Sequence, residues 1–383
     1  MTTRYVKLGF EAAWGVVDTA PFHPTEVESE SMQKVLEFAR LATIRSNSTR
    51  QIALTKSITN GSVTMPGNYN ELGPWLRALF GANDTSGGGD PYTHTFPGAS
   101  GTTGRAGVSC VIDAVRDAAL QAFRYSGVKV TGMQISQAES DVPRFTFDTV
   151  GKVEYKSDHT GTDDTSVNAA FMTDSGAAFV VNQFIGWVIV NITQSGATGT
   201  ITANTATTIT ATMSSGDWDS GDSYRIEAPT DPTFVAFSPI LPTELTMQFD
   251  SVEVCARSLT IGVTWPVDET VCLGAATQAR EPKENDVLTV TGEATILFDA
   301  TEMTGLLSKF DGTTDVDVSI VWSKSASRSL TINLNKCRIV GMPVNLDGRT
   351  RQVAVVSFES YYDTDATENI QAVLLNLDAS VVA

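Results

Sequence analysis

Residues 127–136, Gly-Val-Lys-Val-Thr-Gly-Met-Gln-Ile-Ser, return in edited form as residues 336–345, Lys-Cys-Arg-Ile-Val-Gly-Met-Pro-Val-Asn. Both stretches are rich in residues with high strand propensity. A similar stretch that recurs in this way indicates a structural unit that the chain contains twice. The residues that align at one constant separation, and that we take to define the repeat, are Gly132 with Gly341 and Met133 with Met342.

Two weaker sequence matches between the two halves occur in the same order along the chain. Gly61 and the residues after it match Gly292 and its followers, and Met32-Gln33 matches Met247-Gln248. Apolar and polar residues alternate after both glycines, which predicts strands with one buried face. We therefore expect a β-rich structural unit that is duplicated in the chain.

Each of the two predicted strands is followed by a short helical pattern. Residues 71–81 combine a proline in the first turn with Gly81 at the end, and residues 301–310 give the matching helix of the second copy. Their apolar positions fall on one helix face and should pack into the core. These core positions are Leu72, Trp75, Leu76 and Leu79 in the first helix and Met303, Leu306 and Leu307 in the second.

Residues 158–228 differ from both copies in composition. They are rich in Thr, Gly and Ala, and they contain eight acidic residues but a single base, Arg225. Short β-prone runs separated by turns predict a small β module. We expect mainly β structure: two tandem β-sandwich domains at 1–157 and 229–383, each with a short flanking helix, and a small inserted β domain at 158–228 that projects outward.

The composition restricts the function. A formal net charge of −18 argues against a surface that grips nucleic acid or an anionic membrane. No stretch is apolar enough to suggest a signal peptide or a membrane span, so we expect no membrane association. The four cysteines form no C-x-x-C pair, and we expect mostly buried, reduced thiols.

No catalytic or metal-binding pattern emerges. The acidic run 217–222 resembles a calcium loop but lacks the required residues at loop positions 5, 6 and 12. The three glycines at 87–89 lack the Gly-Lys-Ser/Thr ending of a phosphate-binding loop, and no G-x-S-x-G motif occurs. We expect no enzymatic activity and no cofactor.

One charged stretch is unusual in so acidic a chain. From Phe38 to Asn70 there is no Asp or Glu. The stretch is either a solvated basic hairpin or a loop that docks onto an acidic face of another copy, which would orient the contact. The candidates for this contact between subunits or rings are Arg40, Arg45, Arg50 and Lys56.

Several of these segments resemble the major tail tube proteins of long-tailed bacteriophages. The resemblance covers residues 1–157 and about 229–383, and it rests on the segments 8–15, 24–31, 61–76 and 92–96 together with the duplication. It implies β-sandwich subunits that close into rings and stack into a hollow tube. Ordinary members carry one unit and form six-membered rings, so two units in one chain imply trimers with pseudo-sixfold symmetry.

The resemblance also implies partners and a location. The chain would assemble with itself and with the tape measure, tail terminator and distal tail proteins, and double-stranded DNA would pass through transiently. It would assemble in the cytoplasm of the bacterial host and reside in the virion tail. Two alternatives stay open: another ring-forming tail or baseplate component, and a host- or glycan-binding β protein that uses the inserted module.

Overall fold

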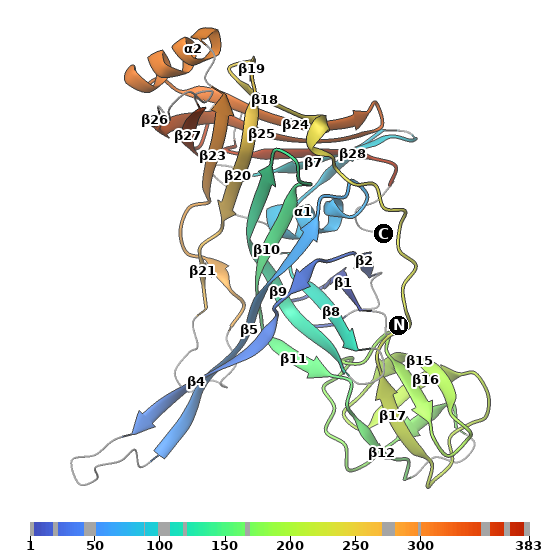
Figure 1. Ribbon diagram of the computed structural model, residues 1–383. Helices are drawn as coiled ribbons and strands as arrows, with labels where there is room; N and C mark the ends of the chain where they lie inside the picture. The colour runs from blue at the N-terminus through green and yellow to red at the C-terminus, as the bar shows by residue number, and fades with distance from the viewer. Residues whose placement is uncertain are drawn as a thin grey trace.

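The computed structural model describes residues 4–17, 22–41, 51–87, 89–98, 108–117, 121–164, 169–269, 280–297, 300–345, 353–363 and 368–378. Within these residues the chain is mainly β, as the sequence predicts, with a large antiparallel sheet, a curled six-stranded sheet and two α-helices (Figure 1).

Two sets of strands form the large sheet. The first set contains β1 (Tyr5–Phe10), β2 (His23–Thr25), β3 (Ser29–Glu30), β4 (Gln33–Leu41), β5 (Gln51–Pro66), β6 (Asp84–Ser86), β7 (Tyr92–Pro97), β8 (Cys110–Asp117), β9 (Gln121–Ala138), β10 (Arg144–Gly151) and β11 (Val153–Lys156). The second set contains β18 (Leu245–Phe249), β19 (Val252–Val254), β20 (Ala256–Thr264), β23 (Thr289–Leu297), β24 (Val316–Ser325), β25 (Arg328–Gly341), β26 (Val344–Asn345), β27 (Val353–Ser360) and β28 (Gln371–Asn376). A short 3-10 helix, η1 (Pro242–Glu244), precedes the second set.

The two sets pair their strands in the same order. In the first, neighbours run β2–β1–β8–β9–β10–β5–β4, and β11 also pairs with β9. In the second, they run β19–β18–β24–β25–β27–β23–β20, and β28 also pairs with β25. One topology is therefore built twice.

The registers agree as well. Thr149 of β10 lies opposite Gly61, and its counterpart in β27, Phe358, lies opposite Gly292. Gly132 lies opposite Asp148, and Gly341 lies opposite Ser357. Both ladders are interrupted by an irregularity at the same point, just before these two glycines, so even the β-bulge is repeated.

The predicted match of Met32-Gln33 with Met247-Gln248 is wrong. Met247 lies in β18, whose counterpart by pairing is β1. Met32 lies just before β4 and aligns instead with Ile261 of β20, because both positions fall opposite the glycine of their set. A match of two residues carries too little information to fix a register.

The two sets form one body with a shared core. β9 pairs with β20, which makes an eight-stranded long sheet in the order β3/β4–β5–β10–β9–β20–β23–β27–β25/β26. β7 of the first set pairs with β28 of the second. A single hydrophobic cluster runs from Val6 to Leu374, and Trp322 donates its indole N–H to Gln137 at 2.7 Å across the two sets.

The helices begin and end close to their predicted positions. α1 (Leu72–Phe80) ends at Gly81 in the left-handed conformation, and its four predicted core residues are fully buried. Trp75 donates its indole N–H to Thr25 at 2.9 Å and stacks on Phe147. In α2 (Ala300–Asp311), Leu306 is buried but Leu307 is 40% exposed, and the side chain of Met303 lies outside the described residues. Neither helix is long and apolar enough to cross a membrane.

The insertion forms the curled sheet, in the order β12–β17–β14–β15–β16–β13. It has its own core, built around Phe184, Trp187 and Trp218. Its strands are β12 (Thr160–Thr162), β13 (Phe171–Thr173), β14 (Val188–Asn191), β15 (Ala197–Asn204), β16 (Thr208–Met213) and β17 (Ser223–Glu227).

Successive side chains of β8 and β9 point to opposite faces, so these strands lie between two separate cores. Along β8 and β9, one set of side chains, such as Ile112 and Tyr125, enters the main core. The alternate set, including Val115 and Ala122, packs with Tyr5 into the core of the insertion. The insertion therefore packs on the outer face of β1, β8 and the first part of β9, which pairs with β8, whereas the later part of β9 belongs to the long sheet (Figure 1).

Cys110 and Cys337 are buried thiols and Cys255 is an exposed one, and none of the three forms a disulfide, whereas Cys272 lies outside the described residues. Burial raises the pKa of the Cys337 thiol to about 12, which keeps this thiol protonated at neutral pH.

The repeated glycine of the second set should be intolerant of a side chain. A Cβ added to Gly292 would overlap the ring of the buried Phe358. We expect Gly292→Ala to lower the free energy of unfolding by about 1–3 kcal/mol, the usual cost of overpacking. Gly341→Ala is the matched control, because its nearest neighbour would be at 3.7 Å. Equal urea denaturation midpoints for the two variants would contradict the close approach.

A buried carboxyl should make stability depend on pH. Glu71, at the start of α1, accepts the Glu26 N–H at 2.9 Å through one oxygen, and its burial raises the pKa of the carboxyl to about 7. A raised carboxyl pKa stabilises the fold below its unfolded value near 4.5, and this contribution is lost as the pH rises toward 7. Glu71→Gln should therefore be more stable than the parent chain at pH 8, by up to about 3 kcal/mol. Its advantage should vanish near pH 4 in urea titrations, and an advantage independent of pH would exclude this cause.

Candidate channel-lining face and contact arms

One face of the long sheet is polar across both sets of strands. Along each strand, apolar side chains such as Val63, Phe147 and Ile261 enter the core, and the alternate positions face away from it. Most of these outward positions carry small hydroxyl residues, and Val353 and Val355 are apolar exceptions. In register across the sheet the polar ones include Ser62, Thr64, Thr146, Gln134, Ser136, Ser258, Thr260, Thr264, Thr289, Thr291, Thr295 and Ser357. We name these positions, with the charged ones below, the polar face.

The charges of the polar face are mostly acidic. Asp148, Glu293 and Glu359 are exposed on it, and Arg144 and Arg338 are bases on it, of which Arg338 lies opposite Glu359 and pairs with Asp315. Arg144 donates to Glu28 at 2.7 Å and to Asp141 at 2.5 Å, so two carboxylates neutralise it. Partial burial raises the pKa of Asp148 above its ordinary value. A wall of hydroxyls and few acids has no array of cations that could hold a phosphate backbone.

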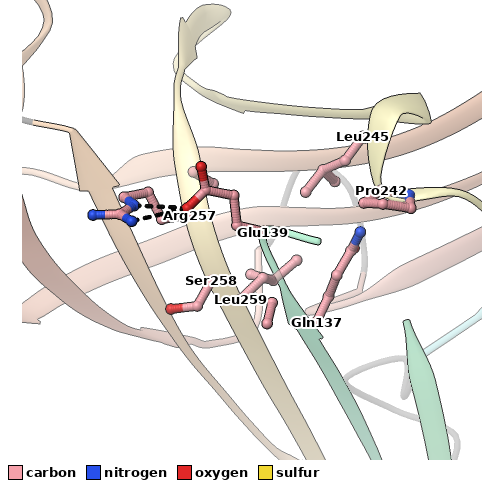
Figure 2. Close-up of a pocket in the computed structure, with 9 residues that line it drawn as sticks. Gln137, Glu139, Pro242, Leu245, Arg257, Ser258 and Leu259 are labelled. Atoms are coloured by element: carbon pink, nitrogen blue, oxygen red, sulfur yellow. Dashed lines mark hydrogen bonds and ion pairs between the residues drawn. The ribbon is translucent and has the colours of Figure 1, made fainter. Parts of the chain in front are cut away.

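The ladder between β9 and β20 joins the two halves of the polar face. Seven residue pairs run from Ser258 opposite Ala138 to Thr264 opposite Gly132. Figure 2 shows the end of this junction, where Arg257 donates to Glu139 at 2.9–3.0 Å. The polar face is thus continuous through the middle of the chain.

Two hairpin arms extend from the long sheet on one side (Figure 1). The first arm is the far part of β4 and β5, and the second consists of β21 (Val267–Asp268) and β22 (Lys283–Glu284). The second arm contacts the first set through two ion pairs. Glu269 pairs with Lys56 at 2.9 Å, and Glu281 pairs with Lys129 at 2.8 Å.

Of the predicted contact bases, Arg40 and Lys56 lie on β4 and β5 of the first arm. Lys56 pairs with Glu37 and Glu269 within the chain and is mostly buried, so its ion pairs are internal. Arg40 is exposed on β4, and Arg45 and Arg50 lie outside the described residues.

The first arm also exposes an apolar face. Phe38 lies opposite Leu54, and Arg40 lies opposite Ile52, so these side chains share one face of the hairpin with Leu36. The four apolar side chains are 38–59% exposed. A two-stranded hairpin is marginal by itself, so an uncovered apolar face of this kind is suited to contact with a partner.

Residues 2–186 match the family model described as "Phage tail tube protein". This part of the chain belongs to the phage tail tube protein family. The match covers the first set of strands and enters the insertion, and the second set repeats the pairing of the first. No curated protein matches the chain. The family is structural and non-enzymatic, as the sequence predicts, and its members reside in the virion tail.

The insertion is anchored by a buried ion pair. Arg124 donates to both carboxylate oxygens of Asp113 at 2.6 and 2.7 Å. Its remaining nitrogen donates to the backbone carbonyls of Gln183 and Ile185 in the insertion, and the ring of Trp187 lies over the guanidinium. Arg124 and Asp113 are at most 1% exposed, so the insertion is docked rigidly on β8 and β9.

The polar face was missed at the level of sequence, although its signal was present. The alternation Thr289, Thr291, Glu293 and Thr295 in β23 marks a strand with a hydroxyl-rich side. A strand with one polar side is ordinary at a protein surface, and only the pairing of β9 with β20 shows that the polar sides of both sets form one surface.

Breaking the anchor should destabilise the whole tail tube subunit. Arg124→Met leaves the carboxylate of Asp113 buried without its cation, which should cost about 3–5 kcal/mol in the free energy of unfolding. Arg124→Met combined with Asp113→Leu removes both charges and should recover most of the loss. Urea denaturation of the three chains measures this, and a single variant as stable as the parent would show that the pair is not an anchor.

Proposed function

We propose that this chain forms the rings of a phage tail tube, with the polar face of the long sheet lining the channel. The observation that carries the proposal is the continuous eight-stranded sheet, in which two sets of identical pairing present one hydroxyl-rich face. Residues 1–157 and 229–383 each act as a tube domain with one flanking helix, and the two domains share one core. Two tube domains in each chain favour a ring of three copies with pseudo-sixfold symmetry.

The strand count agrees with a closed barrel. Each set contributes four strands to the long sheet, so three copies supply about 24. Strands spaced ~4.8 Å apart and tilted by ~40° then close at a backbone diameter of roughly 50 Å. Inward side chains leave a bore of about 35–40 Å, wider than a DNA duplex of about 20 Å. Small hydroxyl residues on the polar face keep this bore open.

The charge of the face suits transient passage of double-stranded DNA. Three acids repel phosphates weakly, and Arg144 is held between Glu28 and Asp141. A lining rich in lysine or arginine would instead bind the backbone through counterion release. DNA would therefore slide along the wall without a fixed binding site.

The insertion, residues 158–228, projects outward in this arrangement. It packs on β1, β8 and β9 from the side opposite the main core, so several layers separate it from the polar face. Placed there, it leaves the bore free. Assembly would take place in the host cytoplasm, with the tape measure, tail terminator and distal tail proteins as the remaining partners.

Negative-stain electron microscopy of the purified protein tests the proposal directly. Hollow tubes with a bore near the estimated width support it. Single rings that never stack would point to a terminator or baseplate role, and monomers at high concentration would contradict ring formation.

The first arm should be needed for assembly between subunits or rings. Reversing Arg40, Arg45 and Arg50 to Glu should leave a folded chain, because Arg40 is exposed on the arm, but one that forms short tubes or none. Circular dichroism checks folding, and microscopy measures tube length. Reversal of Lys156, Arg225 and Lys324, outside the arm, serves as a control for net charge, and tubes of normal length from the triple variant of the arm would refute the contact.

A further inference from the structure

The long sheet has two open ends, and each has a paired counterpart inside the chain. At one end, within the described residues, no strand covers the outer edge of β3 and β4, whereas the equivalent strand β20 is covered by β9. At the other end, no strand in the described part of the chain covers the outer edge of residues 341–345, whereas the equivalent part of β9 is covered by β20. The junction inside the chain therefore pairs copies of the two open edges.

This internal junction fixes a register for the open edges. Glu30 lies opposite Val63, and Leu259 lies opposite Ala294, so β3 and the start of β4 align with β20. Carrying this alignment forward places Lys34 at the position of Val263. Met342 corresponds to Met133, and Val263 lies opposite Met133. The same pairing between open ends puts Lys34 opposite Met342 and Gln33 opposite Pro343.

The backbone groups at both edges have the required phase. Pro343 accepts the Val355 N–H, so it faces β27, and its missing N–H leaves the open edge intact. The backbone N–H and C=O groups of Met342 and Val344, on either side of Pro343, therefore point away from β27 toward the open edge. Ser31 donates to Ser62 of β5, so by alternation Lys34 and Leu36 direct their N–H and C=O outward.

Exposure marks the same positions. In the internal junction Trp265 donates its backbone N–H to Thr131 at 2.7 Å, and these residues are 4% and 9% exposed. Their counterparts at the open ends are Leu36, 41% exposed, and Val340, 55% exposed. Two apolar side chains are thus in solvent at positions that are buried where the junction is formed.

We infer that the chain contains an internal copy of its own subunit interface. The edge of β4 from one subunit binds the edge formed by the end of β25 and β26 of a second copy, with Lys34 opposite Met342 and with Leu36 against Val340. This inference rests on the proposed ring and specifies which strands close it. The contact is head-to-tail, so it builds a ring where the rotation closes and does not give a two-fold dimer.

The junction inside the chain and the proposed junction between two copies differ in charge. The second arm uses Glu269 and Glu281 against Lys56 and Lys129. The counterpart of Glu269 on the first arm is the base Arg40, and the counterpart of Lys129 is Arg338, which already pairs with Asp315. The contact between copies therefore depends on the backbone ladder and on apolar contact instead of these ion pairs.

Cysteine cross-linking tests the register. Gln33→Cys and Pro343→Cys, in a background of Cys255→Ser and Cys272→Ser, place two thiols at a non-hydrogen-bonded pair, where Cα atoms lie about 4.5 Å apart. Oxidation of assembled protein should give covalent multimers that stop at the ring size. Lys34→Cys with Pro343→Cys is the matched control, because a shift of one residue puts the thiols on opposite faces.

A mixing experiment shows that the bond joins two copies. Equal amounts of the two single-cysteine chains, assembled together, should give covalent dimers only. Assembled rings without a cross-link, or equal cross-linking in the shifted control, would overturn the inference while leaving the tube intact. A parent chain that never assembles would contradict the tube and the junction together.

A second variant covers the case in which the cysteine chains assemble poorly. Leu36→Asp changes an exposed side chain, so the subunit should stay folded, but ring formation should fall at least tenfold in sedimentation assays. Val252→Asp, at a position 51% exposed on β19, which is part of neither open edge, should assemble as the parent does. Normal assembly of Leu36→Asp would also overturn the inference.

Discussion

The constraint on which the structure depends is that a β-strand edge needs a partner for its N–H and C=O groups. The ladder between β9 and β20 satisfies this need in the middle of the chain, where it joins two sets of strands into one sheet. The same ladder creates the continuous core, the continuous polar face and the internal junction. Without it, each set would be a small sandwich with two exposed edges.

Duplication turns this constraint into geometry. Because the two sets repeat the same registers and the same bulge, the rotation from the first set to the second should be close to the rotation from the second set to the first set of the next subunit. A sheet that grows by equal steps closes into a ring or continues as a helix. The family assignment of residues 2–186 agrees with closure into a tube.

The insertion shows how an addition can be accommodated by such a sheet. It occupies the outer face of β8 and β9, where Arg124 and Asp113 bury a charged pair to fix its position. That attachment gives the insertion a defined orientation relative to the polar face, at the cost of making the subunit dependent on one ion pair. A module docked in this way behaves as a rigid outer layer of the subunit.

The sequence by itself determined the repeated unit, both helices and the β class, because these follow from local periodicity. The sequence also contains the glycines that must lie close to neighbouring backbone or to an aromatic side chain. It did not reveal that the two sets share one core, since the pairing of β9 with β20 and of β7 with β28 links residues that are distant in sequence. It also placed Lys56 at an interface between subunits, whereas the tertiary structure engages this base with two acids of its own chain. Alternation shows which side of a strand is polar, but only long-range pairing decides which polar sides meet and which edges stay open.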